Sequence, residues 1–360
     1  MNISIFASIW CQNLWDELIV KNEIELLRKE ISSTQKQDKA SSNWQDINFR
    51  VASYDPCNPV FNIPDVQYFE YFPIAIRSKK NIFRNIKNLY QYIKTILWSD
   101  MVVIGWWGII YDNEFQSVWN PLRQWLVRVK IARFFRKKIY FYAVWIDITY
   151  EENFHIVKNI FKHAYKITVR DIKSQEQLKN IWIHSEVVDD PVMHENNWKW
   201  IIYKTFSSHN FSLKDFTDID FKEKEVWLAL RRGYIGKSKN FQIEKLLVQE
   251  LCVFIEQRGW KIVFLPHSFH PSDSQANDYI FMKEFLQDHR QIKKTLWEVY
   301  EWYKENVYQD NTSILAKKEK ILISMRLHSI ILASVYNISQ VILSYSEKTH
   351  QVIYKLSKKE

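Results

Sequence analysis

The stretch that decides the fold lies near the carboxyl end and reads KILISMRLHSIILASVYNISQVILSYS, Lys320–Ser346. It begins with an apolar, β-branched run of the length of a buried strand. Apolar residues at helical spacing follow the Arg-Leu-His triplet at 326–328, and a second apolar run, VILSYS, closes the stretch. A strand, a turn with a helix, and another strand make up the unit from which parallel sheets are built.

The same unit recurs along the rest of the chain. In the first half MVVIG follows the helical pattern NIFRNIKNLYQYIKTILWSD, and in the second half KEVWLALRR precedes NFQIEKLLVQELCVFIEQRG. This alternation predicts an α/β fold with two doubly wound, Rossmann-like domains. Because residues 196–220 break the rhythm, we expect an amino-terminal domain over 1–195, a connection over 196–220 and a carboxyl-terminal domain over 221–360.

The composition indicates a folded protein with acidic partners. The 360 residues are 47% hydrophobic and 25% charged, as in globular proteins, and the formal net charge is +9. This charge favours phosphorylated substrates, anionic membrane surfaces or nucleic acid. No apolar run is long enough to span a bilayer, the amino terminus lacks a signal-peptide pattern, and the three cysteines are far apart. We therefore expect a soluble protein of the cytoplasm.

The numbers of glycines and tryptophans are unusual. The chain has 5 glycines and 16 tryptophans, whereas a chain of this length has about 25 glycines on average. Tryptophans stand at strand exits, as in VVIGWWGIIYDNE (Val102–Glu114), where the turn normally needs glycine. We predict that many of them are glycine in the native protein, through UGA codons read as glycine. UGG at codons 10, 15, 106, 107 and 145 would contradict this prediction; the alternative is a set of aromatic platforms for sugars.

With glycine at these positions, the motifs at the strand ends resemble those of the polysaccharide pyruvyl transferase family, in matching order over nearly the whole chain. The motifs are FASIWCQNLWDELIV, VVIGWWGIIYD, VRDIKSQEQL, VVDDPVM, LALRRG, SMRLHSIILA and LSYSEKT. The resemblance implies two Rossmann-like domains in a GT-B-like arrangement with a cleft between them. It also implies phosphoenolpyruvate as donor, a sugar of a cell-surface glycan as acceptor, and a pyruvate ketal as product.

On the donor side, Arg326 and His328 match the Arg-Leu-His donor-binding motif of the family. Arg326 would clamp the donor anion, because the planar guanidinium binds carboxylate and phosphate through two hydrogen bonds. His328 would contact the phosphate or deliver a proton to the methylene carbon of the donor. A surface cation and a core histidine are the alternatives for these two residues.

Further contacts to the donor are expected from the other strand ends of the second half. Arg231 and Arg232 end LALRRG, and because neighbours at a strand end face opposite ways, we expect one of them to point toward the ligand. Arg231 aligns better with the arginine of the family. Lys348 is either another anion contact or a solvated lysine, and His267 either binds acceptor or phosphate or is an ordinary loop histidine.

On the acceptor side, Asn13 and Asp16 follow the first predicted strand. The family resemblance implies that Asn13 shapes the loop or contacts the acceptor and that Asp16 is the base for the hydroxyl proton. The helix dipole also explains an acid at this position. Gly105, Trp106 and Trp107 form the turn after a later strand, where glycines would allow substrate to approach the backbone closely. No metal and no cofactor are expected.

The resulting hypothesis is a pyruvyl transferase that moves the enolpyruvyl unit of phosphoenolpyruvate onto a glycan or a lipid-linked sugar. A GT-B-type glycosyltransferase with a nucleotide sugar and an inactive glycan-binding homologue stay open as alternatives. The basic residues Lys79, Lys80 and the run RFFRKK (Arg133–Lys138) are either solvated or a peripheral contact with the inner face of the cell membrane. Nucleic acid is not an expected partner, because no recognised nucleic-acid module accompanies the charge.

Overall fold

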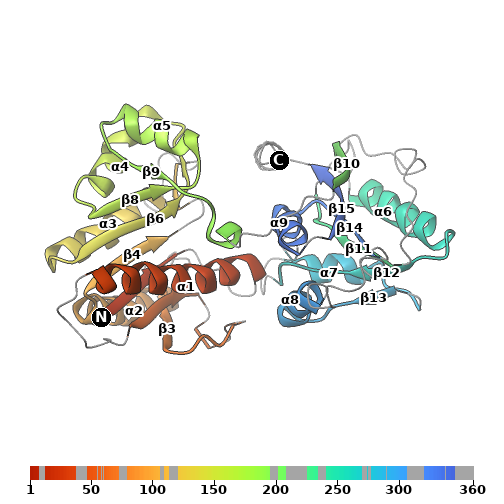
Figure 1. Ribbon diagram of the computed structural model, residues 1–360, viewed down its shortest axis with the longest axis horizontal. Helices are drawn as coiled ribbons and strands as arrows, with labels where there is room; N and C mark the ends of the chain where they lie inside the picture. The colour runs from red at the N-terminus through yellow and green to blue at the C-terminus, as the bar shows by residue number, and fades with distance from the viewer. Residues whose placement is uncertain are drawn as a thin grey trace. The chain divides into compact units, whose positions relative to one another are not determined.

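Two parallel β-sheets organise the chain, one in each half (Figure 1). The structure is a computed structural model in which the chain divides into two units, with the boundary between His194 and Glu195. Leu14 and Trp15 group with the second unit, although the chain that follows them belongs to the first. The residues that the structure describes are 1–7, 13–37, 47–54, 56–57, 59, 61–72, 79–105, 109–112, 121–194, 202–207, 225–233, 241–269, 274, 277–288, 290–305, 320–336 and 338–344.

The first unit contains a parallel sheet of seven strands in the order β3-β2-β1-β4-β6-β8-β9. Its strands are β1 (Asn2–Phe6), β2 (Asn48–Ser53), β3 (Val66–Glu70), β4 (Met101–Gly105), β6 (Lys138–Val144), β8 (Lys166–Val169) and β9 (Glu186–Val187), with β5 (Ile110–Tyr111) and β7 (Ile146–Asp147) paired separately. Its helices are α1 (Leu14–Gln37), α2 (Lys79–Trp98), α3 (Pro121–Phe134), α4 (Phe154–Phe161) and α5 (Ile172–Asn180), with short 3₁₀ turns η1 (Glu151–Asn153) and η2 (Pro191–His194).

The strand order of the first sheet reverses between β1 and β4. Ile5 of β1 pairs with Val51 of β2 on one side and with Val103 of β4 on the other, in parallel register. In open α/β sheets the crevice beyond the carboxyl ends of strands at such a reversal is the usual ligand site. The residues of interest in this unit are therefore those that follow Phe6 and those around Gly105.

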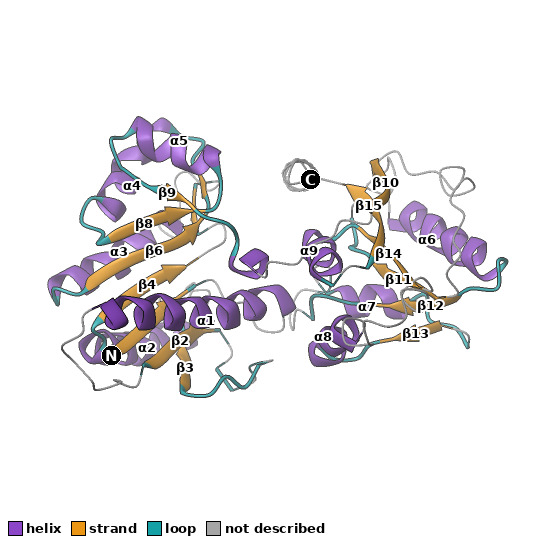
Figure 2. Cartoon of the chain, in the orientation of Figure 1, coloured by secondary structure: helices purple, strands orange, loops and turns teal. Residues whose placement is uncertain are grey.

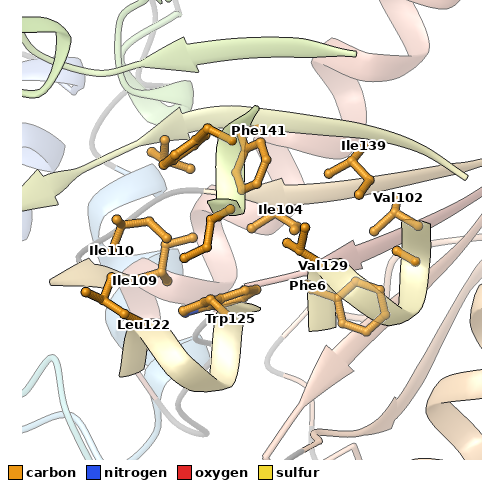
Figure 3. Packing of buried hydrophobic residues seen from close by; sticks show 14 of the residues in the cluster. Phe6, Val102, Ile104, Ile109, Ile110, Leu122, Trp125, Val129, Ile139 and Phe141 are labelled. Atoms are coloured by element: carbon orange, nitrogen blue, oxygen red, sulfur yellow. The ribbon is translucent and has the colours of Figure 1, made fainter. Parts of the chain in front are cut away.

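The core of the first unit forms where α2, α3 and α4 cover one face of the sheet. The strand β4 is buried over its whole length, as expected for a parallel strand with helices on both faces. Figure 3 shows Ile104 of β4 and Phe141 of β6 packed with Trp125 and Val129 of α3. This packing of helices on the sheet holds the carboxyl ends of the strands in place.

The second unit contains a parallel sheet of six strands in the order β10-β15-β14-β11-β12-β13 (Figure 2). Its strands are β10 (Ile202–Ser207), β11 (Glu225–Ala229), β12 (Lys261–Phe264), β13 (Arg290–Ile292), β14 (Lys320–Ser324) and β15 (Ser339–Ser344). Its helices are α6 (Phe241–Glu256), α7 (Asp278–Lys283), α8 (Leu296–Glu305) and α9 (Leu327–Val335). Buried residues of β11, β12, β14 and β15 pack with α6 and α7 in a second core.

The helices α5 and α6 end in the same hydrogen-bonded motif with different residues. Trp182 after α5 has a φ of 63° and Gly259 after α6 has a φ of 75°. The next N–H donates to a carbonyl of the last helical turn, at 3.0 Å after α5 and 3.4 Å after α6. This left-handed position favours glycine, because a β-carbon costs about 1 kcal/mol there. The side chain of Trp182 is 89% exposed, so packing does not offset that cost.

The structure confirms the predicted α/β class with two Rossmann-like units. It adds edge strands that the pattern did not indicate, among them β3 and β13. Residues 202–207, inside the expected connection over 196–220, instead form β10, which pairs in parallel with β15. The GT-B-like arrangement of the two units and the cleft between them stay predictions. Among the described helices, none has the length and apolar character needed to cross a membrane.

Candidate functional site

The carboxyl edge of the second sheet brings together three of the predicted site segments. The strands β12, β11 and β14 are neighbours in parallel register, so the residues that follow them lie along one edge. The N–H of Met325 donates to the carbonyl of Ala229 (3.1 Å), which continues the pairing past the end of β14. Arg326, Arg231 and His267 therefore belong to one sheet edge, as the strand pattern predicted.

Arg326 forms a buried ion pair with Asp278. The guanidinium donates through Nη2 to Oδ1 of Asp278, and the carboxylate side chain is 1% exposed. Arg326 is the N-cap residue of α9, and its own N–H donates to Oγ of Ser324 (3.1 Å). Among the described residues, Nε of Arg326 has no hydrogen-bond partner. The guanidinium is thus held by one edge and keeps a donor for another acceptor.

Arg231 and Arg232 follow β11 and are half-buried. The N–H of Arg231 contacts Sδ of Met325 at 3.3 Å, which ties the end of β11 to the end of β14. Burial raises the pKa of Asp278, and the positive charges of Arg326 and Arg231 oppose that rise. Arg231, which the motif favoured over Arg232, is therefore close enough to Asp278 to act on its charge.

The turn after Arg232 is held by a buried carboxylate. Gly233 has a φ of 88°, and its N–H lies 2.8 and 2.9 Å from the two carboxylate oxygens of Glu244 in α6. A side chain at this φ would be strained. The LRRG sequence therefore makes a fixed turn that presents both arginines at the sheet edge.

His267 is buried inside the site and carries no charge. Its Nε2 hydrogen-bonds with Oγ of Ser329 (2.9 Å) and with the hydroxyl of Tyr303 (3.1 Å). Burial, together with the charge of Arg326, lowers the pKa of His267 to about 3. Its backbone N–H donates to Oδ2 of Asp278 (3.2 Å). Two hydroxyl groups thus contact the Nε2 atom of His267, and its backbone is tied to the carboxylate that pairs with Arg326. Its expected contact with acceptor or phosphate stays a prediction.

His328 lies in the first turn of α9 and is covered by an indole. Its ring stacks on Trp15 with 4.7 Å between centroids and 6° between planes, and both residues are buried. The N–H of Trp15 donates to Oδ1 of Asn13 (3.2 Å), and Asn13 forms a β-bridge with Ser268. Asn13, expected on the acceptor side with the first half, therefore groups with the second unit.

The carboxyl edge of the first sheet contains a buried acid that the sequence did not single out. A β-carbon on Gly105 would lie 3.0 Å from both carboxylate oxygens of Glu23 in α1. Glu23 is fully buried, and neither oxygen has a hydrogen-bond partner among the described residues. Burial therefore raises the pKa of Glu23 well above its usual range. Asp16, the predicted base, is also buried, in the first turn of α1.

Other acids at the strand ends have structural partners. Asp112 is fully buried and accepts hydrogen bonds from the N–H groups of Thr149 (2.8 Å) and Tyr150 (2.9 Å). Asp190, in the VVDDPVM motif, accepts a hydrogen bond from the N–H of Val192 (3.1 Å). These hydrogen bonds give both acids a structural role, because each carboxylate stabilises the backbone of a loop.

Three predicted site residues, Trp106, Trp107 and Lys348, lie outside the described residues. Within the described part of the chain, no group of three or more His, Cys, Asp or Glu side chains is placed to hold a metal ion. A cavity of about 460 Å³ lies at Lys261, the first residue of β12, and is thus at the opposite edge of the second sheet from Arg326.

Sequence reasoning missed Asp278, Ser329 and Tyr303. Asp278 opens α7 directly after its N-cap residue Asn277, so it reads as an ordinary acid at a helix start. Ser329 directly follows the Arg-Leu-His triplet, and this adjacency was the one local signal available. Tyr303 comes from α8, and only the packing of that helix brings it to His267.

Two solved structures resemble the whole chain at a distance. UDP-GlcNAc 2-epimerase from Methanocaldococcus jannaschii is 12% identical, with 98% of this chain and 92% of the other covered and a TM-score of 0.47. UDP-N-acetylglucosamine 2-epimerase from Rickettsia bellii is 10% identical, with 100% and 88% covered and a TM-score of 0.45. Neither likeness is close enough to inform on the reaction. No curated protein matches the sequence significantly.

One family describes most of the chain. The sequence model for polysaccharide pyruvyl transferases matches residues 16–347. This span includes the turns that present Arg231 and Arg326 and the acid, Asp278, that pairs with Arg326. The chain therefore belongs to the polysaccharide pyruvyl transferase family and is an enzyme of the transferase class.

Proposed function

We propose that the enzyme transfers the enolpyruvyl unit of phosphoenolpyruvate to a sugar of a cell-surface polysaccharide or its precursor, as a pyruvate ketal. The observation that carries the proposal is the pair Arg326 and Arg231 at neighbouring strand ends, both acting on the buried Asp278. Both strand ends thus bring a guanidinium group to the same sheet edge. An anionic donor with a carboxylate and a phosphate offers two groups of acceptor oxygens that guanidinium groups bind through paired hydrogen bonds.

Arg326 is the main donor contact in this proposal. Asp278 holds one edge of its guanidinium, so little side-chain entropy is lost when a ligand binds the other donors. Arg231 supplies the second cation, with Arg232 and Lys348 as further anion contacts. In this proposal His267 does not contact the donor. It is held by Ser329 and Tyr303 and positions Asp278, the partner of Arg326, through its backbone N–H.

The transfer requires proton movements that His328 and Asp16 would perform. A proton is added to the methylene carbon of the donor while a sugar hydroxyl oxygen bonds to C2 and gives up its proton to a base. A second hydroxyl of the same sugar then replaces the phosphate at C2 and passes its proton to the departing phosphate, which leaves as inorganic phosphate. We assign His328 as the acid and Asp16 as the base, with Asn13 and the turn at Gly105 shaping the acceptor site. No cofactor takes part in this scheme.

The stacked indole on His328 bears on this assignment. Trp15 covers one face of the imidazole, and a glycine at position 15, as the codon prediction has it, would open that face. The substitution Trp15→Gly should therefore increase the access of donor to His328. An unchanged KM for the donor in this variant would argue against contact between His328 and the donor.

Incubation with isotopically labelled phosphoenolpyruvate and candidate glycans tests the proposal. We expect label in the glycan together with released phosphate. Turnover of a nucleotide sugar instead would identify a glycosyltransferase, and binding of glycan without turnover would identify an inactive homologue.

Arg326→Lys is the more informative variant for this assay. Arg326→Ala would leave Asp278 buried without its cation and could lower activity by destabilising the fold. Lysine keeps the charge but cannot form two parallel hydrogen bonds, so kcat/KM for the donor should fall at least about tenfold. Arg258→Lys is the matched control, since Arg258 is an exposed arginine of the same unit. Equal activity of the two variants would remove Arg326 from the donor site.

We also propose that the reaction takes place in the cytoplasm. The sparse cysteines favour a reducing compartment, and both described cysteines, Cys57 and Cys252, are free thiols. A lipid-linked acceptor would place the enzyme at the inner face of the cell membrane. Recovery of the protein from the cytoplasmic and membrane fractions of cells, and not from the exterior, is the expected result.

A further inference from the structure

The helix α2 carries large apolar side chains on the side that faces away from the core. Phe83 is 75% exposed and Tyr90 is 69% exposed. With Ile86 and Leu97, which are also exposed, they recur at steps of three, four and seven residues, which places them on one stripe of the helix. Tyr92, on the opposite side, is buried in the first core.

Cations alternate with these apolar residues on the same stripe. Lys87 and Lys94 are exposed, and neither has an ion-pair partner among the residues described in the structure. Arg84, by contrast, lies off the stripe and forms an ion pair with Glu70. The outward side of α2 is therefore both apolar and positively charged.

The helix α3 repeats this pattern. Arg123, Val127, Lys130 and Phe134 follow one another at steps of four, three and four residues, and all four are exposed. Phe134 is 80% exposed. Val129, on the opposite side of α3, is buried in the same core as Tyr92 of α2.

The two stripes belong to one surface of the first unit. The hydroxyl of Tyr92 in α2 donates to the carbonyl of Arg128 in α3 (2.9 Å), and Nζ of Lys137, just after α3, donates to the carbonyl of Leu97 (3.0 Å). Both helices lie on the face of the first sheet opposite to α1 (Figure 1). We call this surface the α2–α3 face, made up of Phe83, Ile86, Lys87, Tyr90, Lys94, Leu97, Arg123, Val127, Lys130 and Phe134.

The charge of these helices has one sign. The sequence of α2 contains five Lys or Arg residues and that of α3 contains four, and neither contains Asp or Glu. Soluble surfaces ordinarily intersperse both signs. Two copies of the α2–α3 face would repel each other, so charge complementarity selects an anionic partner over a second copy of the chain.

We propose that the α2–α3 face docks the enzyme on an anionic lipid bilayer. The aromatic and aliphatic side chains would enter the boundary between headgroups and acyl chains, as in helices that lie in the plane of the membrane. The lysines and arginines would extend to the lipid phosphates along the same surface. Docking of this kind does not depend on the transfer reaction, although it would bring the enzyme to a lipid-linked acceptor.

Co-sedimentation of the full chain with vesicles tests this proposal without donor or acceptor. We expect binding to vesicles of phosphatidylcholine mixed with phosphatidylglycerol, little binding to phosphatidylcholine alone, and loss of binding at high salt. The double substitution Lys87→Glu with Lys94→Glu should lower the partition coefficient at least about tenfold. Phe83→Ser with Tyr90→Ser should also lower it about tenfold.

Matched variants separate docking from general surface effects. Lys87→Arg with Lys94→Arg keeps the charge and should retain binding. Leu246→Ser with Val253→Ser removes exposed apolar residues from α6, a helix of the second unit, and should leave binding unchanged. Circular dichroism and thermal unfolding should be equal for all variants, because every substituted side chain is exposed.

Four results would overturn the proposal. One is equal binding to vesicles with and without phosphatidylglycerol, and a second is equal binding of wild type and charge-reversed variant to the anionic vesicles. Another is a concentration-dependent dimer in analytical ultracentrifugation that Phe83→Ser with Tyr90→Ser abolishes, since this would make the face an interface between copies. The last is binding to a single-stranded oligonucleotide through Lys87 and Lys94 with no binding to anionic vesicles.

Discussion

The carboxyl edges of the two sheets differ in whether a buried acidic side chain has a partner. At the edge of the second sheet, Asp278 is buried against Arg326, and its carboxylate also accepts a hydrogen bond from the N–H of His267. At the edge of the first sheet, Glu23 is buried against Gly105, with no hydrogen-bond partner among the described residues. One edge contains a paired charge, and the other contains an acid whose pKa is raised by burial.

The same contrast appears in the backbone. The second unit has glycine where a helix ends in the left-handed conformation, at Gly259, whereas the first unit has tryptophan at the equivalent position, Trp182. At Gly259 and at the Asp278–Arg326 pair of the second unit, the residue types agree with their surroundings. At Trp182 and Glu23 of the first unit, the residue type opposes the conformation or the burial, and agreement of this kind is what stabilises a fold.

The largest expected effect is at the paired edge. Arg326→Ala should lower the free energy of unfolding by about 3–5 kcal/mol, because it leaves the carboxylate of Asp278 buried without its cation. Urea unfolding of the purified protein measures this loss. Arg258→Ala, at an exposed arginine of the same unit, should cost about 1 kcal/mol or less.

A double-mutant cycle separates the pair from its surroundings. Arg326→Ala together with Asp278→Ala should destabilise less than the sum of the single substitutions, because no uncompensated charge is left. Additive losses would mean that the two side chains do not interact, and the contrast between the two edges would fail.

The next effect is at the unpaired edge and depends on pH. The folded-state pKa of Glu23 is raised above its ordinary value of 4.5, so above pH 4.5 the unfolded chain releases a proton that the folded chain keeps. Stability should fall by up to about 1.4 kcal/mol per pH unit until the folded-state pKa is reached. Glu23→Gln removes this proton, so it should stabilise at pH 8 and change little at pH 4.5. A gain in stability that is independent of pH would contradict the raised pKa of Glu23.

For His267 we expect the opposite dependence of stability on pH. Its folded-state pKa of about 3 lies below its ordinary value of 6.5, so the unfolded chain binds the proton first. Its contribution is complete above pH 6.5 and is lost toward pH 3, at up to about 1.4 kcal/mol per pH unit. Asp278 and Glu23 act in the other direction, so the difference between wild type and His267→Gln isolates the histidine. Parallel stability profiles of the two proteins would exclude this account.

The smallest effect concerns the helix ends. Trp182→Gly should stabilise the protein by about 1 kcal/mol, because glycine adopts the left-handed conformation without strain. The reciprocal change Gly259→Ala should destabilise by a similar amount, and both are measured by thermal unfolding. Destabilisation by Trp182→Gly would mean that the indole makes contacts worth more than the strain. A UGG codon at position 182 would exclude recoding of glycine there.

Local sequence predicted the frame of the candidate site but not its partners. Apolar runs alternating with helical patterns indicated the strands, and parallel strands bring their carboxyl ends to one edge, so Arg231 and Arg326 were expected together. Asp278 was not predicted as a site residue. An acid at the start of a helix is common, and nothing in the local sequence indicates which cation it pairs with. Trp15 on His328 is likewise a contact between segments at opposite ends of the chain.

The sequence by itself determined the α/β class, the division into two Rossmann-like halves and the family, because hydrophobic periodicity and short motifs are local properties of the chain. Only the tertiary structure decided which charges are paired, that burial lowers the pKa of His267, and that Glu23 is buried against Gly105 with no hydrogen-bond partner among the described residues. The physical reason is that pairing and burial are relations between distant residues. The pKa of a group follows its solvation and its neighbours in space, and residue order along the chain specifies neither.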